Sequence, residues 1–155
     1  MRDIHEHTAG EDLIIKTAVR MLVPFIQLFG LYVIVHGHYS PGGGFQGGVI
    51  LGAAFILLAL AYDIKTSKEF MTVRINRIFT NLGAAIFIGV GVFSALFGGL
   101  FLDYAALNKL IPLGRIEWHS FGIFLVEVGV GLTVMSIMVL LYWNLSSGGT
   151  LDEGL

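Results

Sequence analysis

The sequence predicts an all-α integral membrane protein with four transmembrane helices. Three observations support this fold class. First, charged residues make up 13% of the 155 residues, whereas soluble domains carry roughly 25%, and the mean hydropathy is +0.82. Second, four apolar runs each approach the roughly 20 residues that cross a bilayer as a helix. Third, these runs are neither short nor alternating in polarity, as the strands of a membrane β-barrel would be.

The first two runs are joined by a glycine-rich segment. Residues 13–36 form the first run, and its charged residues, Lys16 and Arg20, lie near its start, where long side chains can extend to the membrane interface. Residues 45–62 form the second run, and Asp63 marks its end. The residues between the two runs are expected to form a glycine-rich turn.

The last two runs are separated from their neighbours by polar segments. The third run, residues 78–102, follows the basic segment DIKTSKEFMTVRINR and ends at Asp103. The fourth run, residues 119–143, follows the mixed segment DYAALNKLIPLGRIE. The chain is therefore expected to consist of a polar head (1–12), a four-helix membrane domain (13–143) and a short acidic tail (144–155).

The distribution of lysine and arginine predicts the orientation. With four spans, both termini and the segment between the second and third runs share one face, which carries seven of the nine basic residues. The other face carries Lys109 and Arg115. Because cytoplasmic loops are enriched in lysine and arginine, both termini are expected in the cytoplasm.

The composition also excludes several functions. The chain has no cysteine, so disulfides and thiolate metal sites are ruled out. Its formal net charge of −2 gives no reason to expect a nucleic-acid partner. No nucleophile–base pair and no constellation of metal ligands appears in the sequence, so we expect neither an enzyme nor a bound cofactor or metal.

The glycine-rich segment HGHYSPGGGFQGG, residues 36–48, is the most unusual stretch. Its glycines match a dinucleotide-binding spacing, but such a loop needs a strand before it and a βαβ unit around it, which membrane helices do not provide. A metal site is disfavoured because His36, His38 and His119 supply too few ligands. A plain hairpin would need fewer glycines. We therefore expect a tightly packed backbone buried in protein at membrane depth.

Ten residues of this segment are candidates for a site. They are His36, His38, Ser40, Pro41, Gly42, Gly43, Gly44, Phe45, Gly47 and Gly48.

Small residues at four-residue spacing form stripes on the second and third helices. Gly48 and Gly52 lie on the second, and Gly91, Ala95 and Gly99 on the third. Such stripes let helix backbones approach closely. Packing within this chain and contact with other subunits are both compatible with them.

The fourth run carries two polar stripes on different faces. At about 100° per residue, one face holds Gly122, Gly129, Thr133 and Ser136, and the other holds Ser120, Phe124, Glu127 and Gly131. Glu127 is the only carboxylate well inside an apolar run, about 12 Å from its start. An acid at this depth normally faces a partner or a water path. Glu127 is therefore either an interface acid or part of an ion path.

The segment VRMLVPFIQLFGLYVIVHGHYSPGGGFQGGVILGAAFILLALAYD, together with FLVEVGVGLTV near the end, resembles the MnhB-domain family. These proteins are the B subunits of Mrp-type multisubunit cation/proton antiporters, and similar subunits occur in membrane-bound hydrogenases and sulfur-reducing complexes. The resemblance covers about residues 14–143, and its most specific part is the glycine-rich segment. Glu127 stands where many antiporter B subunits have an aspartate.

The resemblance implies an accessory, non-catalytic subunit in the plasma membrane of a prokaryote. Its expected partners are the bilayer and other membrane subunits, including large antiporter-like subunits, in a complex that exchanges Na⁺ and H⁺. One alternative is the same module in an ion-pumping respiratory complex. Another is a free-standing small transporter or channel. This alternative is weakened because a single intramembrane carboxylate provides few ionisable groups for coupled exchange.

Overall fold

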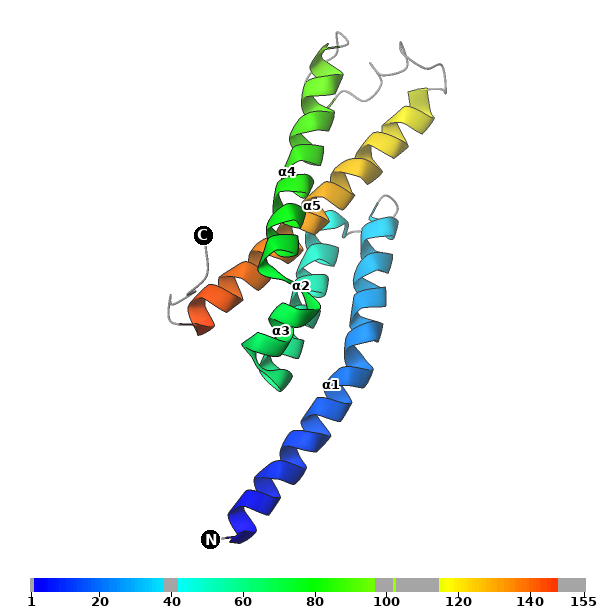
Figure 1. Cartoon of the computed structure of the whole chain (residues 1–155). Helices are drawn as coiled ribbons and strands as arrows, with labels where there is room; N and C mark the ends of the chain where they lie inside the picture. Colours follow the sequence, from blue (N-terminus) through cyan, green and yellow to red (C-terminus); the bar gives the residue numbers. More distant parts are fainter. Residues whose placement is uncertain (1, 38–41, 97–101, 103–114, 148–155) are drawn as a thin grey trace.

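A computed structural model describes residues 2–37, 42–96, 102 and 115–147. Its elements are five helices: α1 (Arg2–His36), α2 (Gly44–Tyr62), α3 (Ile64–Phe70), α4 (Val73–Leu96) and α5 (Arg115–Ser146) (Figure 1). Four stretches are long and apolar enough to cross a bilayer: Asp12–His36, Gly44–Tyr62, Val73–Leu96 and His119–Ser146. For the described residues, the predicted all-α fold with four membrane spans is confirmed.

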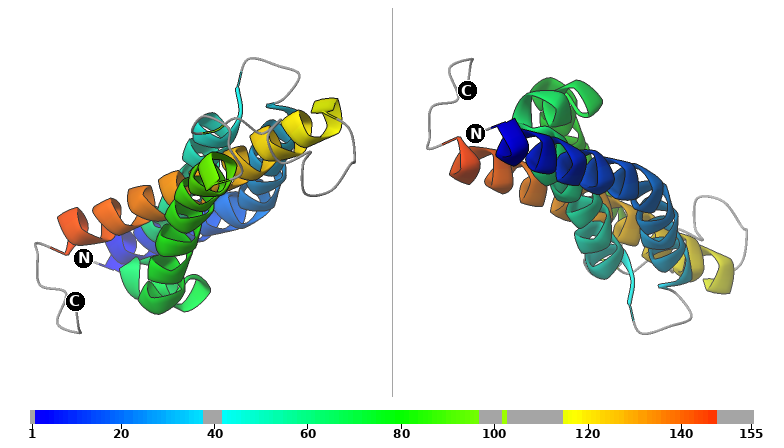
Figure 2. Two further views of the ribbon diagram at one scale, coloured as in Figure 1. Left: turned by 90° about the horizontal axis from the view of Figure 1, so that it is seen from above. Right: turned by 90° about the horizontal axis from the view of Figure 1, so that it is seen from below.

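Helix α5 lies in the middle of the arrangement. On one side it packs against α2, which in turn packs against α1, and on the other side it packs against α4 (Figures 1 and 2). The main interfaces thus follow one another as α1–α2–α5–α4. This is an open row of helices rather than a ring, so most of each outer helix faces away from the chain.

The segment between the second and third predicted spans contains more structure than expected. It holds the short helix α3 and the first turn of α4, which starts at Val73 rather than at residue 78. Asp63, with φ 99° and ψ 156°, is the single residue between α2 and α3. Helix α4 can begin early because Arg74 and Arg77 are exposed, and polar residues at a helix end need no apolar surroundings.

The outer helix ends also differ from the predicted boundaries. Helix α1 begins at Arg2, so the predicted polar head continues the first span as one helix, with Pro24 inside it. Helix α5 extends from Arg115 to Ser146, several residues beyond the apolar run at each end. Hydropathy finds the apolar part of a helix, whereas backbone hydrogen bonding continues into the polar flanks.

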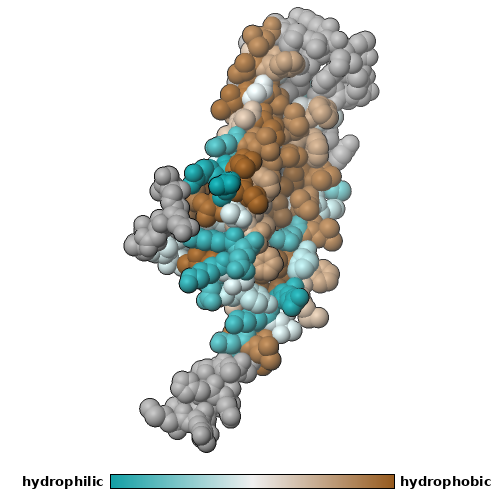
Figure 3. All heavy atoms as spheres, in the orientation of Figure 1, coloured by the Kyte–Doolittle hydropathy of each residue, from teal (hydrophilic) through white to brown (hydrophobic). Residues whose placement is uncertain are grey.

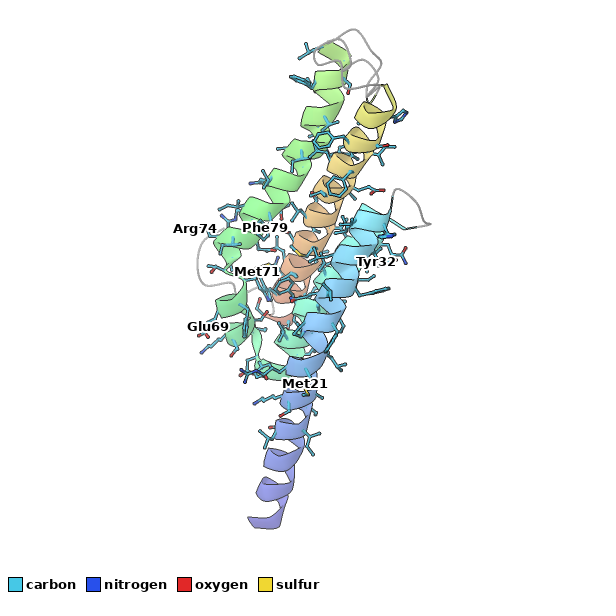
Figure 4. All side chains as sticks on the ribbon, turned by 90° about the vertical axis from the view of Figure 1, so that its right-hand side faces the viewer. Met21, Tyr32, Glu69, Met71, Arg74 and Phe79 are labelled. Carbon is cyan, nitrogen blue, oxygen red and sulfur yellow. The ribbon has the colours of Figure 1, made fainter. Side chains whose placement is uncertain are left out.

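Among the side chains that the structure describes, the largest fully buried one is Trp143 on α5. It is 0% exposed, and its indole Nε1 donates a hydrogen bond to Oγ of Ser67 on α3 at 3.2 Å. Met71, which follows α3, belongs to the same core, whereas Glu69 and Arg74 project outward on either side of it (Figure 4). The Trp143–Ser67 contact ties the connector between α2 and α4 to the central helix.

Hydrophilic side chains gather around α3 and the start of α4, and hydrophobic ones cover the part above them (Figure 3). Along α1, large apolar side chains such as Met21, Phe25 and Leu28 are each more than 60% exposed. Because a folded chain in water does not leave such a row uncovered, this surface fits lipid or other membrane subunits.

Candidate functional site

The predicted loop ends in a backbone conformation that only glycine readily adopts. Gly43 precedes α2 with φ 116° and ψ −157°, a region of backbone angles essentially restricted to glycine. Its carbonyl accepts the first hydrogen bond of α2, from the Gly47 N–H at 3.0 Å. Gly43 therefore sets the direction in which α2 leaves the loop.

Glu127 of α5 lies against this start of α2. A methyl group on Gly37 would fall 2.7 and 2.8 Å from its two carboxylate oxygens, and one on Gly43 would fall 2.9 Å from Oε1. A methyl group on Gly44 would overlap the backbone carbonyl of Glu127. The three glycines, which we call the glycine cradle, thus enclose both the side chain and the backbone of Glu127, and its Oε2 is buried.

Below the cradle, α2 and α5 touch backbone to backbone. A methyl group on Gly48 would fall 2.6 Å from the carbonyl oxygen of Gly131, and one on Gly52 would fall 3.2 Å from Cβ of Met138. Gly44, Gly48 and Gly52 are therefore one stripe at four-residue spacing that lies along α5. This stripe fixes the rotation of α5 so that Glu127 faces the loop.

The cradle also gives Glu127 a favourable electrostatic setting. The first turn of α2 has no acidic residue of its own, and a helix N-terminus carries about half a positive charge on its unpaired N–H groups. A carboxylate there gains typically about 0.3–1 kcal/mol and up to about 2 kcal/mol when partly buried. Glu127 lies about 12 Å inside its span, and a charge at the centre of a membrane helix costs roughly 2.5–3.5 kcal/mol on insertion scales. The N-terminus of α2 therefore offsets part of the cost of a charge on Glu127.

The opposite stripe of α5 faces α4. A methyl group on Gly129 would fall 2.9 Å from the carbonyl oxygen of Gly83, and one on Gly83 would overlap Thr133. Thr133 donates its hydroxyl to the carbonyl of Gly129 at 2.9 Å. The two faces of α5 predicted from its polar stripes thus pack against two different parts of the chain.

The other candidate residues occupy varied positions. Gly47 is buried against α1 near Gly30 and Ile34, whereas Gly42 and Phe45 are exposed. His36 is exposed and stacks on the ring of Tyr32, with 4.3 Å between ring centroids.

On α4, Gly91 is buried and Ala95 is exposed. Four candidates, His38, Ser40, Pro41 and Gly99, lie outside the described residues.

Within the part of the chain that the structure describes, no group of three histidine, aspartate or glutamate side chains could hold a metal ion. His36 and His119, two of the three histidines considered for such a site, are both exposed near helix ends. The chemistry that this site can offer comes from one carboxylate against a helix N-terminus. Carboxylate oxygens bind protons and hard cations such as Na⁺.

Sequence reasoning named the loop and Glu127 separately and missed that they form one site. The sequence did contain a signal. Gly44, Gly48 and Gly52 follow one another at four-residue spacing, and Glu127 and Gly131 are also four residues apart. This matching spacing suits two helices that cross at close distance. It also missed the buried polar residues at the α3–α4–α5 junction, Ser67 and Asn76, which are 1% and 0% exposed.

Fold and site together define a multi-span membrane protein with a carboxylate enclosed between its helices. Residues 14–140 match the family described as "Domain related to MnhB subunit of Na+/H+ antiporter". The chain is 38% identical over 132 residues to the Na⁺/H⁺ antiporter B subunit of Bacillus subtilis (strain 168), covering 80% of this chain and 90% of that protein. It is 32% identical over 138 residues to "Putative antiporter subunit mnhB2" of Staphylococcus epidermidis (strain ATCC 12228 / FDA PCI 1200), covering 88% and 96%. This chain belongs to the MnhB family.

Proposed function

We propose that this chain is the B subunit of a multisubunit Na⁺/H⁺ antiporter, that it has an accessory role in assembly, and that Glu127 lies on the ion path of the complex. The observation that carries the proposal is the glycine cradle, which holds the carboxylate of a family member against a helix N-terminus inside its membrane span. The names of the relatives, which are antiporter subunits, support the same function.

An accessory role follows from the arrangement of the helices. Among the described residues, the helices form an open row, α1–α2–α5–α4, which does not close into a ring. An ion that reaches Glu127 must therefore pass along a surface that another subunit covers. The large exposed apolar side chains of α1 and α4 supply such surfaces, with large antiporter-like subunits as the expected partners.

The chain alone should catalyse no exchange. Purified and reconstituted in proteoliposomes with an imposed pH gradient, it is expected to give no sodium-dependent proton movement above that of empty liposomes, because it lacks the subunits that complete the path. The whole complex, reconstituted in the same way, is the positive control. Exchange by the isolated chain would instead establish a free-standing transporter.

The orientation with both termini in the cytoplasm of a prokaryotic cell belongs to the same proposal. It rests on the basic residues of α3 and of the start of α4, among them Lys65, Lys68 and Arg74, which lie on the same side as the start of α1. The glycine cradle would then be closer to the outer face, because α1 ends and α2 begins there.

A natural absence of cysteine makes this orientation easy to test. In intact cells, a membrane-impermeant maleimide should label Lys109→Cys, and it should label Lys65→Cys only after the cells are permeabilised. Lys65 is exposed next to Asp63, so poor access to the side chain does not explain a lack of labelling. The reverse pattern would invert the topology.

A further inference from the structure

A second buried polar cluster lies where the start of α4 crosses α5, on the face of α5 away from Glu127. Asn76 of α4 and Ser136 of α5 are both 0% exposed. The Asn76 side-chain Nδ2 donates a hydrogen bond to the backbone carbonyl of Ser136 at 2.9 Å. This bond places the carboxamide of Asn76 directly on Ser136.

Two oxygen atoms of this cluster make no hydrogen bond within the described chain. Among the described residues, neither Oδ1 of Asn76 nor Oγ of Ser136 has a hydrogen-bond partner, and both atoms are buried. Rotating the carboxamide by 180° would face its oxygen toward the Ser136 carbonyl, two acceptors together, so the assignment of Nδ2 and Oδ1 stands. Leaving a buried polar atom without a hydrogen-bond partner is destabilising.

Ser136 differs from four other hydroxyl residues within helices. Thr17, Thr80, Ser94 and Thr133 each donate to the backbone carbonyl four residues earlier, at 2.8–3.0 Å. This is the usual way in which a serine or threonine satisfies its hydroxyl within a helix. Ser136 makes no such bond, so its hydroxyl remains available to something outside its own helix.

We propose that Asn76 and Ser136 bind one water molecule between α4 and α5. The water would donate a hydrogen bond to Oδ1 of Asn76, which can only accept, and a second bond would join it to Oγ of Ser136, which can donate or accept. A buried water needs two to four polar partners, and the hydrogen bond between Asn76 and Ser136 shows that the two residues carrying these oxygens are in direct contact. Both side chains are neutral, which favours water over a cation.

This site is independent of the proposed function of Glu127. The water would supply hydrogen bonds to the two buried oxygens where α4 crosses α5, next to the connector that the Trp143–Ser67 hydrogen bond holds in place. Because both residues are 0% exposed, bulk water does not reach these atoms, so the bound molecule would be part of the folded structure.

The direct test is a map of the assembled complex at a resolution that shows ordered water. We expect a peak within hydrogen-bond distance of both Oδ1 of Asn76 and Oγ of Ser136. If the two side chains are resolved with no peak between them, or if Oγ bonds directly to Oδ1, the proposal is wrong.

A matched pair of variants tests the same site by stability. Ser136→Ala and Ser94→Ala remove hydroxyls that are both 0% exposed, but Ser94 serves only the Val90 carbonyl of its own helix. If Ser136 holds a water, its loss should lower the melting temperature of the complex by about 2–4 °C more than the loss of Ser94.

Two other outcomes would overturn the proposal. A Ser136→Ala complex as stable as Ser94→Ala, or more stable than the wild type, would mean that the hydroxyl was buried without a ligand. Stabilisation of the wild type by Na⁺ over K⁺ that is lost in Ser136→Ala would identify a cation site instead.

Discussion

The Glu127→Gln variant is expected to assemble normally and to lose most of the exchange activity of the complex. Glutamine has the same length as glutamate and therefore fits the glycine cradle, whose close contacts leave no room for a longer side chain. It cannot release a proton or offer a charged oxygen to Na⁺. Removing a positioned proton-transfer group typically costs about 10²-fold or more in rate, so we expect exchange to fall at least about tenfold.

The measurement is sodium-dependent proton movement in vesicles that contain equal amounts of assembled complex. Glu69→Gln is the matched control, because Glu69 is an exposed carboxylate on α3, and it should retain full exchange. Glu127→Asp should retain part of it. Full exchange by a normally assembled Glu127→Gln complex would remove Glu127 from the ion path and leave it a structural role.

The Gly44→Ala variant should impair assembly of the complex. The added methyl group would overlap the backbone carbonyl of Glu127, and a backbone atom cannot rotate away as a side chain can. Relief therefore requires α2 and α5 to separate along the whole Gly44, Gly48 and Gly52 stripe. Overpacking typically costs about 1–3 kcal/mol, and here it also displaces Glu127, so we expect a severalfold lower yield of complex on a native gel.

Gly89→Ala is the control for this experiment. Gly89 also lies within a membrane helix, but no atom of the described chain lies within 4 Å of its added methyl group. Because alanine favours a helix over glycine by about 1 kcal/mol, the yield should be unchanged or higher. If Gly44→Ala assembles as well as Gly89→Ala, the close contact between α2 and α5 is not required.

The four membrane spans could be predicted from the sequence because each is a property of one continuous segment. Hydropathy and length decide whether such a segment enters a bilayer, and neighbouring helices change this little. Helix α3 could not be found in this way, since seven residues, IKTSKEF, are too few for a helical period to stand out. Its position depends on the Trp143–Ser67 bond, which joins distant parts of the chain.

The parts of the candidate site could be predicted from the sequence, but the contact between them could not. The run of glycines and the isolated Glu127 each stand out in the sequence, but their contact depends on how α5 crosses α2. That crossing is set by which glycines meet, Gly48 with Gly131 in particular. Asn76 gave no signal of this kind, because an asparagine near a helix start is common, and Ser136 stood out only as one member of a polar stripe on the fourth run.

The burial of Trp143 gives the protein an internal optical reporter. The chain has two tryptophans, and replacing Trp118 with phenylalanine would leave fluorescence that comes from Trp143 alone. Its ring is fully enclosed and its N–H is held by Ser67, so its emission depends on whether α3 stays docked on α5. Movements of the connector during transport could then be followed by the fluorescence of Trp143, without any added label.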